Sequence, residues 1–366
     1  MQVIAIANQK GGCGKTTSSI NLAACLAHLK KKVLLVDLDP QGHATCGLGI
    51  RAEELPYSLY DLLSPKDEQK PGVSEVLIEI NPHFCLLPSH TVLSAVEEEL
   101  AFHGGRQKRL KSLLFRVAQE IGDFDHIIID CPPNLGVLTY NALDAADEVI
   151  IPLEPSFFSL HGLAKITETI QWVNQERKRA IELHALMTIY DARTCFAREV
   201  YEEVERYFSE RLFRAVIHES VLLKEAASAG QSIVDYEPDS IPFYDYLSVA
   251  TELMERQWSR ILPEQETRWL DKIQNRYGPR SVCGGVLFQC YNKYARFVEI
   301  AGDFNNWIPE ALVQRNDNGL WQKVITAHGG ACRYKFIVDG EWQVDPHQLE
   351  QRENAYGSFD SYLEVG

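Results

Sequence analysis

Positive charge is scarce in this sequence. Thirty-six lysine and arginine residues stand against 51 aspartate and glutamate residues, which gives a net charge of −15 over 366 residues. The deficit is spread along the chain, because residues 283–366 carry 7 basic and 11 acidic side chains and residues 1–282 carry 29 and 40. Proteins that hold nucleic acid through its phosphates usually display a basic surface. The charge balance therefore argues against nucleic acid as the default partner.

Long apolar runs are also missing. The longest, such as VIAIA and EVIIPL, fall far short of the roughly 18 residues that a membrane-spanning helix needs. The N-terminus shows no basic segment followed by a cleavable apolar one, so we expect no secretion signal and no membrane partner. Nine cysteines, an odd number without any CxxC pair, argue against a disulfide framework. We expect a cytoplasmic protein with reduced thiols.

The first 262 residues alternate short apolar runs with longer amphipathic ones. The runs QVIAIA, KVLLVD, HIIID and EVIIPL are nearly continuous and rich in β-branched residues, as in parallel strands buried on both faces. Helices are predicted over residues 16–30, 106–121, 160–177, 197–208 and 243–261. This alternation predicts an α/β domain over residues 1–262, with a doubly wound, mainly parallel sheet.

The pattern changes after Arg260. Residues 263–282 are polar and are predicted to form a connector. From Val286 onward helical periodicity disappears, and VLFQCYN, ARFVEIAG, LWQKVITA and RYKFIVDG are short β-rich runs separated by turn sequences. We expect residues 283–366 to form a small all-β, immunoglobulin-like sandwich.

A glycine-rich stretch, KGGCGKTT, lies between the first predicted strand and the first predicted helix. In that context glycines allow a tight turn whose N–H groups point at phosphate oxygens, and the helix N-terminus adds its dipole. Lys15 would reach the β- and γ-phosphates, and the Thr16 hydroxyl would ligate Mg²⁺. The predicted nucleotide-binding residues are Lys10, Gly11, Gly12, Cys13, Gly14, Lys15, Thr16 and Thr17. A turn that merely links strand to helix is the less favoured interpretation.

Three aspartates follow predicted strands. Asp37 and Asp39 lie in VLLVDLDPQG, and Asp130 lies in HIIIDCPP. Ligands of open parallel sheets bind beyond the carboxyl ends of the strands, so all three could converge on the glycine-rich loop. An aspartate after a strand is by itself more often a turn former. Together with the loop, the three favour metal or water positioning.

KGGCGKTT, DLDPQG and DCPP resemble the deviant Walker A, Walker A′ and Walker B motifs of ParA-type partition ATPases, P-loop enzymes in which two subunits enclose two ATP molecules. The similarity covers most of residues 1–262. It implies that ATP and Mg²⁺ are the cofactors and that ATP binding produces a homodimer. Lys10, the signature lysine, would reach the partner's nucleotide. Thr16 would hold Mg²⁺ with Asp37 and Asp130 in its outer shell, and Asp39 would orient the attacking water. The resemblance thus predicts Lys10, Lys15 and Asp39 as catalytic residues.

One segment departs from the partition ATPases. Where they carry basic residues for nonspecific DNA binding, this chain reads IHESVLLKEAASAGQ, residues 217–231. His218 and Glu219 replace a proline–arginine pair, Leu222 replaces an arginine and Gln231 replaces a lysine, while Lys224 is a single new cation. Phosphate binding sums over cations, so we expect weak or absent DNA binding.

The C-terminal region resembles the glycogen-binding modules of AMP-activated kinase β subunits. The resemblance rests on AGDFNNW, YKFIVDGEWQVDP and GSFDSYLEV. It implies an α-glucan site made of Trp307, Lys335, Trp342 and Asp360, the last standing where the family has asparagine. Indole rings stack on the apolar faces of sugars. Trp321 is expected in the core. The alternative is a sandwich that keeps the fold without binding sugar.

Three functions remain open at this point. The first is a slow, partner-stimulated ATPase that switches between states to position or recruit a cargo, with glycogen as the favoured cargo. The second is a signalling or scaffold ATPase whose sandwich binds a protein partner. The third, a DNA-partitioning ATPase, conflicts with residues 217–231 and with the acidic balance.

Overall fold

The computed structural model describes residues 1–65, 70–100, 106–156, 159–175, 177, 179–255, 279–282, 285–292, 295–314, 320–326, 330–345, 348, 350–354 and 357–365. The chain divides into two compact units, Met1–Arg260 and Ile261–Gly366. Most of the predicted connector lies outside the described residues. In the part of the chain that the structure describes, none of the helices combines the length and apolarity needed to cross a membrane.

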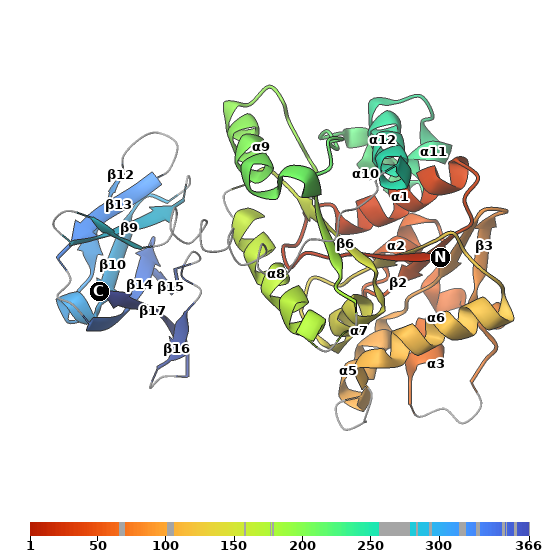
Figure 1. Cartoon of the computed structure of the whole chain (residues 1–366), viewed down its shortest axis with the longest axis horizontal. Coiled ribbons are helices and arrows are strands. Elements are labelled where there is room, and N and C mark those ends of the chain that lie inside the picture. The colour runs from red at the N-terminus through yellow and green to blue at the C-terminus, as the bar shows by residue number, and fades with distance from the viewer. Residues whose placement is uncertain are drawn as a thin grey trace. The chain divides into compact units, whose positions relative to one another are not determined.

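The first unit is built on one sheet (Figure 1). Its strands are β1 (Gln2–Ile6), β2 (Val33–Asp37), β3 (Ile78–Asn81), β4 (Phe84–Leu87), β5 (His126–Asp130), β6 (Glu148–Leu153) and β7 (Glu182–Met187). Their order is β3-β4-β2-β5-β1-β6-β7, and every described pair is parallel except β3 with β4. The doubly wound, mainly parallel sheet is confirmed.

Helices surround this sheet. They are α1 (Lys15–His28), α2 (His43–Gly47), α3 (Leu59–Leu63), α4 (Val73–Val76), α5 (Ala95–Leu100), α6 (Arg109–Glu120), α7 (Val137–Ala145), α8 (Ser159–Gln175), α9 (Cys195–Phe208), α10 (Val221–Ser228), α11 (Ile233–Tyr236) and α12 (Ile241–Glu255). Helix α1 packs against α11 and α12, whereas α6 packs against α3, α4 and α7. The five helices expected from the sequence correspond to α1, α6, α8, α9 and α12. The ends of the first four differ from the expected ones by a few residues, and residues 256–261 of the fifth lie outside the described residues.

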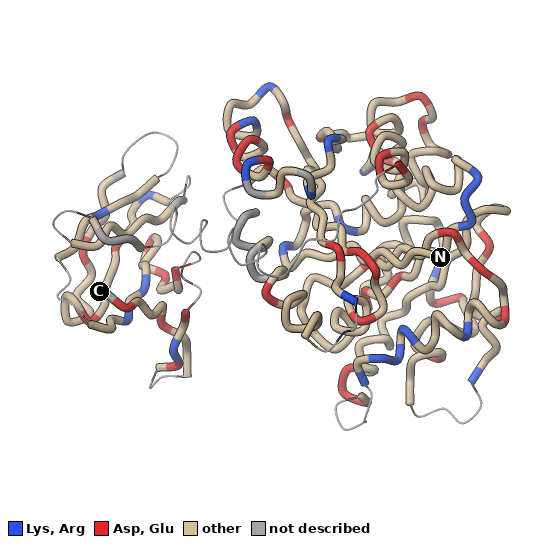
Figure 2. Tube along the Cα trace, viewed as in Figure 1, with Lys and Arg blue, Asp and Glu red and all other residues tan. Residues whose placement is uncertain are grey.

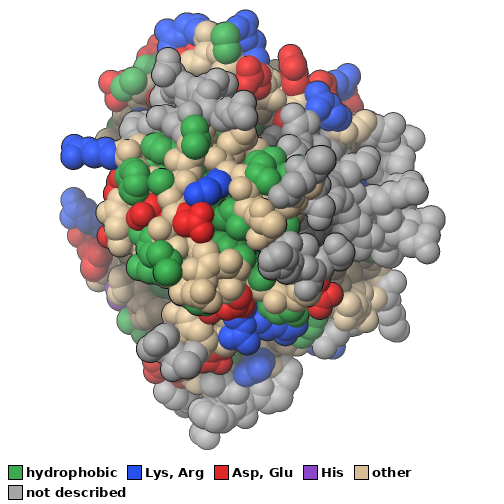
Figure 3. Space-filling view, turned by 90° about the vertical axis from the view of Figure 1, so that its left-hand side faces the viewer, with side chains coloured by type: hydrophobic (Ala, Val, Ile, Leu, Met, Phe, Trp, Pro, Cys, Tyr) green, Lys and Arg blue, Asp and Glu red, His purple; other side chains and the backbone are tan. Residues whose placement is uncertain are grey.

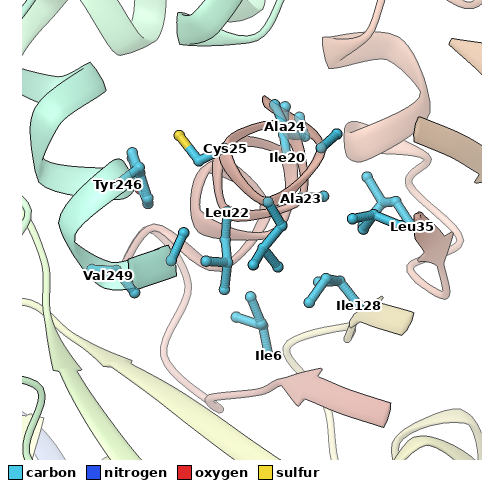
Figure 4. Packing of buried hydrophobic residues seen from close by; sticks show 14 of the residues in the cluster. Ile6, Ile20, Leu22, Ala23, Ala24, Cys25, Leu35, Ile128, Tyr246 and Val249 are labelled. Carbon is cyan, nitrogen blue, oxygen red and sulfur yellow. The ribbon is translucent and has the colours of Figure 1, made fainter. Parts of the chain in front are cut away.

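Helix α1 lies at the centre of the main apolar core. The apolar cluster consists of its own buried residues together with residues of strands β1, β2 and β5 and of α12 (Figure 4). Between Ile20 and Ala27 every residue is buried. The helix is therefore covered on several sides, which anchors the loop that precedes it. Ser18 and Tyr246 complete the contact with α12 through a buried hydroxyl–hydroxyl hydrogen bond of 3.1 Å.

A tight backbone contact joins two distant loops of the first unit. Gly49 and Gly230 both have a positive φ, and a Cβ added at Gly230 would lie 2.6 Å from Gly49 Cα. Only glycine fits such an approach. The contact ties the residues after α2 to the residues after α10.

The second unit consists of two antiparallel sheets (Figure 1). Its strands are β8 (Arg280–Val282), β9 (Gly285–Tyr291), β10 (Val298–Gly302), β11 (Glu310–Ala311), β12 (Val313–Gln314), β13 (Leu320–Ile325), β14 (Gly330–Val338), β15 (Glu341–Gln343), β16 (Gln351–Glu353) and β17 (Phe359–Val365). One sheet has the order β12-β13-β9-β8, and the other β11-β10-β14-β17-β16 with β15 on β14. Strand β8 pairs with β9 although it lies within the stretch expected as connector.

Both sheets contribute to one apolar core. Phe288 and Trp321 from the first sheet pack in the same cluster as Ile300, Tyr334 and Phe336 from the second. This arrangement confirms the small β-sandwich. Trp321 is buried in it, as expected from the sequence. On the face shown in Figure 3, hydrophobic side chains are interspersed with charged ones.

Candidate functional site

The glycine-rich loop leads from β1 into α1. Gly12 and Gly14 have φ values of 75° and 82°, a conformation that side chains rarely tolerate, and α1 begins at Lys15. A Cβ added at Gly12 would meet nothing within 4 Å, so the glycine serves the backbone conformation and not packing. Thr16 and Thr17 lie half-buried in the first turn of α1. The loop has the form that directs main-chain N–H groups toward a phosphate.

Lys15 and Cys13 close the loop from inside. Lys15 is 7% exposed, and its Nζ donates to the Lys10 carbonyl at 2.9 Å. The Cys13 thiol donates to the same carbonyl at 3.2 Å. Burial raises the pKa of this thiol, with the two lysines opposing the shift, so Cys13 fills the loop as a neutral side chain.

A threonine that the sequence reasoning missed also holds the loop. Thr188 Oγ1 donates to the Cys13 carbonyl at 2.8 Å, and its own side chain is buried. Thr188 directly follows β7, at the edge of the sheet where the other strands also deliver polar residues. The only signal of this role in the sequence was a polar residue directly after an apolar run.

The carboxylates of Asp37 and Asp130 occupy matching positions on neighbouring strands. The two residues are register partners at the ends of β2 and β5, and both are completely buried. Burial raises the pKa of each carboxyl group, and the carboxylate of Asp37 raises that of Asp130 further. Ser19 Oγ donates to Asp130 Oδ1 at 2.8 Å, and this bond and the Thr16 hydroxyl oppose the rise in the pKa of Asp130.

One carboxylate oxygen of the Asp37–Asp130 pair has no hydrogen-bond partner in the described part of the chain. Among the described residues, Asp130 Oδ2 is buried and accepts no hydrogen bond. An unpartnered buried carboxylate oxygen is costly unless a cation or a bound water completes it. The oxygen ligands that Mg²⁺ prefers are therefore present beside Thr16.

Asp39 and Asp37 are held by a small buried network. The Thr45 hydroxyl and main-chain N–H donate to Asp37 Oδ2 at 2.7 and 2.8 Å. Ser89 Oγ donates to the Asp39 carbonyl at 2.7 Å, and Ser89 N–H donates to Thr45 Oγ1 at 2.9 Å. Asp39 Oδ1 accepts from Gln41 N–H at 2.9 Å. Thr45 and Ser89 were not predicted, because neither lies in a recognised motif.

The first lysine of the loop has a partner within its own chain. Lys10 Nζ lies 2.5 Å from Glu154 Oε2 and 2.8 Å from Ser156 Oγ, just after β6. The exposed fractions of the two charged side chains are 26% and 34%. Lys10 and Lys15 are thus held differently, one by an acidic partner and one by the loop.

The sandwich places two indole rings side by side. The ring centroids of Trp307 and Trp342 are 6.3 Å apart, with 30° between the planes. Trp342 is 50% exposed on β15. Trp307 is half-buried and has a φ of 62°, and its Nε1 donates to Asp303 Oδ1 at 2.9 Å. Two accessible indoles of nearly common orientation make an apolar platform.

The predicted polar sugar ligands form a separate network. Lys335 Nζ lies 3.1 Å from Asp360 Oδ1 and donates to Ser358 Oγ at 3.0 Å. Asn354 Nδ2 donates to Asp360 Oδ1 and to Ser358 Oγ, both at 2.7 Å. Lys335 and Asp360 are buried. Asp360 lacks the amide donors that the asparagine of the glycogen-binding modules would supply. Asn354, a residue that the sequence did not single out, supplies an amide to the same network.

A loop that opens into a buried helix, with two lysines and aspartates at adjacent strand ends, defines a P-loop ATPase. Residues 1–183 match the model of a family described as an AAA domain. Residues 287–366 match the model described as the glycogen recognition site of AMP-activated protein kinase.

Comparison with similar proteins indicates which family of P-loop ATPases the chain resembles. The sporulation initiation inhibitor protein Soj of Bacillus subtilis is 41% identical over 253 residues, which cover 69% of this chain and 98% of Soj. The chromosome partitioning protein ParA of Myxococcus xanthus is 40% identical over 257 residues, with coverages of 70% and 88%. A crystal structure of cobyrinic acid a,c-diamide synthase from Mycobacterium smegmatis, with a bound ATP analogue and magnesium, is 33% identical with a TM-score of 0.59, covering 72% of this chain and 100% of that one.

The chain belongs to the ParA-type ATPases and carries a module of the glycogen-binding family at its C-terminal end. As in that ATPase family, its cofactors are ATP and Mg²⁺, which the loop, Thr16 and the unpartnered oxygen of Asp130 fit.

Proposed function

We propose that this ATPase is a cytoplasmic switch that dimerises on ATP and recruits or positions an α-glucan, with glycogen as the cargo. The observation that carries the cargo assignment is the pair of accessible indoles, Trp307 and Trp342, 6.3 Å apart. Sugar rings present apolar faces that suit such a platform, while Lys335 and Asp360, which are buried and paired with each other, would exchange hydrogen bonds with hydroxyl groups once that pair opens.

In the ATPase unit, each charged residue has a proposed task. Lys15 holds the phosphates of its own nucleotide, and Thr16 binds Mg²⁺. When bound, Mg²⁺ neutralises charge that develops on the phosphates. Asp37 and Asp130 orient this assembly from their buried positions, and the network through Thr45 and Ser89 keeps Asp39 placed to orient water. The work of the protein is positioning and charge stabilisation.

Dimerisation gives Lys10 a function. Lys10 serves the nucleotide of the partner subunit once its contact with Glu154 is broken. A dimer carries two sandwiches, so a glucan with many chain ends can be held at two points. Bivalent binding raises retention without a new contact. A protein that stimulates hydrolysis would then release the cargo.

DNA is the less suitable cargo. In the region where partition ATPases carry cations, the His218 ring lies 3.0 Å from Asp245 Oδ2, beside Glu219. We expect random duplex DNA to bind weakly or not at all in the presence of ATP at low salt. Tight binding in a gel shift under those conditions would favour the partitioning function instead.

Co-sedimentation with glycogen tests the cargo. We expect the wild-type protein to sediment with glycogen more strongly with ATP and Mg²⁺ than without nucleotide, and Trp307→Ala or Trp342→Ala to abolish sedimentation. Trp172→Ala is the matched control, because Trp172 is a 45% exposed tryptophan of the ATPase unit. Unchanged sedimentation of both sandwich variants would refute the sugar site. Absence of any sedimentation would favour a scaffold ATPase whose sandwich binds a protein.

A further inference from the structure

The loop that carries Trp307 is organised around one exposed carboxylate, that of Asp303. The loop follows β10 and begins with a short 3-10 turn, Asp303–Asn305. Asp303 Oδ1 accepts a hydrogen bond from the indole N–H of Trp307 at 2.9 Å, and Asp303 Oδ2 accepts one from the main-chain N–H of Arg333 at 2.8 Å. Each oxygen of this side chain therefore has its own donor, one from the loop and one from β14.

The backbone of the loop is held in an unusual conformation at Trp307. The φ of Trp307 is 62° and that of Asn306 is 54°. Asparagine tolerates this left-handed region, whereas a bulky residue is rarely found there. The main-chain N–H of Trp307 donates to the Gly302 carbonyl at 2.9 Å. This bond fixes the backbone but not the side-chain torsions, so the orientation of the indole depends on its own contacts.

The second indole is placed in a different way. Trp342 lies on β15 and is the register partner of Ile337 on β14. Sheet pairing sets its backbone, and among the described residues its indole N–H has no hydrogen-bond partner. The two ring centroids are 6.3 Å apart, with 30° between the planes. Because a strand places one ring and a loop places the other, the loop determines the angle between them.

Asp303 also connects the indoles to the polar part of the proposed sugar site. Arg333 lies on β14 two residues before Lys335, and Lys335 is the register partner of Ala301 on β10. Strands β10, β14 and β15 are neighbours in one sheet (Figure 1). A Cβ added at Gly302 would lie 2.5 Å from the Arg333 carbonyl oxygen. The start of the loop is therefore in close contact with the strand that carries Lys335.

Neither attraction of a ligand nor anchoring of the loop explains both bonds of Asp303. An α-glucan is uncharged, and charged residues of both signs lie along the strands of the second unit (Figure 2). Anchoring of the loop to β14 accounts for the bond from Arg333. It does not account for the bond from the indole of Trp307, because an exposed carboxylate oxygen can be satisfied by water.

We propose that Asp303 is a positioning residue, which holds the ring of Trp307 at the angle to Trp342 that an α-glucan needs. This role rests on the sugar site of the proposed function. A ring that is oriented before binding loses less conformational entropy when a sugar stacks on it. If the ring turns freely, only the correctly oriented fraction of molecules binds, and the apparent affinity falls by that fraction. Asp303 acts on the sugar only through Trp307.

Circular dichroism of the full-length protein measures the orientation of the rings without any sugar. Two indoles this close couple their electronic transitions and give a band of two signs, whose size depends on the angle between the rings. The chain has six tryptophans, so the band is taken as the difference between the wild type and Trp307→Phe. We expect Asp303→Asn to lose about half of the band or more, because the amide oxygen can accept only one of the two bonds.

Calorimetric titration with maltoheptaose, a linear α-1,4-glucan, measures the consequence for binding. Asp303→Asn should lower the affinity of the wild type about five- to tenfold. In the Trp307→Phe background the same substitution should lower it less than about twofold, because no indole N–H remains to be held. Asp303→Ser, whose single oxygen is also too short to accept both bonds, replaces Asp303→Asn if the latter does not unfold cooperatively.

Asp339→Asn is the matched control. Asp339 is an exposed aspartate of the same unit, and its Oδ1 accepts from the main-chain N–H groups of Arg296 and Phe297, both at 2.9 Å. An asparagine oxygen can keep both bonds, so the substitution makes the same charge change without losing an acceptor. We expect neither the dichroism band nor the affinity for maltoheptaose to change.

Three results would overturn the proposal. The first is a full dichroism band in Asp303→Asn, and the second is a lost band with unchanged affinity. The third is an equal loss of affinity in the wild-type and Trp307→Phe backgrounds, which would show that Asp303 only anchors the loop. A wild type that does not bind maltoheptaose would instead refute the proposed sugar site, while loss of the band in Asp303→Asn would still support the orientation of Trp307 by Asp303.

Discussion

Lys10 Nζ and Glu154 Oε2 form an ion pair of 2.5 Å within one chain. If Lys10 serves a second subunit, this pair holds it back until ATP draws the subunits together. Partly exposed pairs of this kind contribute about 0.2–1 kcal/mol. The structure thus contains a contact that opposes the proposed dimer.

Glu154→Ala should therefore increase dimerisation. We expect the dimer fraction at limiting ATP and Mg²⁺ to rise about two- to fivefold, measured by sedimentation velocity. Glu53→Ala, which removes an exposed carboxylate elsewhere, should leave the fraction unchanged. A fall in the dimer fraction would show instead that Glu154 acts across the interface.

Asp130→Asn should make the nucleotide-free protein more stable and remove its stabilisation by ATP and Mg²⁺. Without nucleotide, the substitution removes one of two buried, mutually repelling carboxylates, while the amide oxygen can still accept from Ser19. We expect the free energy of unfolding to rise on the order of 1–3 kcal/mol. The additional stabilisation that ATP and Mg²⁺ give the wild type should be lost.

Thermal unfolding with and without ATP and Mg²⁺ measures both effects. Asp123→Asn, an exposed change of the same kind on the loop before β5, should alter neither. A less stable nucleotide-free Asp130→Asn protein would mean that the carboxylate contributes to the fold and not only to the site.

His126, at the start of β5, should make stability depend on pH. Its pKa lies below the ordinary value of 6.5, because burial disfavours the imidazolium; Lys31 and the N-terminal amine also lower it, and Asp125 opposes them. Below pH 6.5 the unfolded chain binds a proton that the folded chain resists. This contribution to stability is complete above pH 6.5 and is lost as the pH falls through the folded pKa.

His126→Gln should flatten this dependence. In urea unfolding between pH 7.5 and about pH 5, the slope of the free energy of unfolding should decrease by up to about 1.4 kcal/mol per pH unit. His90→Gln, at a half-buried position outside the sheet, should retain the wild-type slope. An unchanged slope in His126→Gln would show that other groups carry the acid sensitivity.

Asp360→Asn should tighten glucan binding at a cost in stability. The carboxylate holds Lys335 Nζ at 3.1 Å, whereas asparagine would add amide donors and leave the ammonium more available to hydroxyl groups. We expect retention on glycogen to increase about three- to tenfold, and the sandwich to lose about 1–3 kcal/mol of unfolding free energy.

Affinity electrophoresis in glycogen-containing gels, with thermal unfolding in parallel, tests this expectation. Glu364→Gln neutralises an exposed carboxylate on the same strand, β17, and is the matched control. Weaker retention in Asp360→Asn would mean that the Lys335–Asp360 pair itself presents the sugar-binding surface.

The sequence predicted most of what local patterns encode. The strands that end at Asp37 and Asp130 were recognisable, because strands buried on both faces are nearly continuous in apolar residues. Their convergence followed from the topology of parallel sheets. The short antiparallel pair β3–β4 and the helices α7 and α10 were missed, because brief segments carry little periodicity.

The residues that support the site were harder to find. Thr45, Ser89 and Thr188 act through hydrogen bonds to residues 8, 50 and 175 positions away in the chain. Such contacts depend on tertiary packing, and a single threonine or serine in a sequence carries no sign of it. The Lys10–Glu154 contact was missed for the same reason, since 144 positions separate the two residues.

The backbones of Gly49 and Gly230 are in contact. This contact links a surface loop to the helix that supports the aspartate site. Helix α2, which begins six residues after Asp37 and supplies Thr45, ends just before Gly49. Gly230 lies in residues 217–231, the segment that departs from the basic pattern expected of partition ATPases. Because there is no room for even a methyl group between the two loops, we expect a shift of α2 to displace residues 217–231 as well. We therefore expect a change in the position of α2 beside the aspartate site to reach residues 217–231.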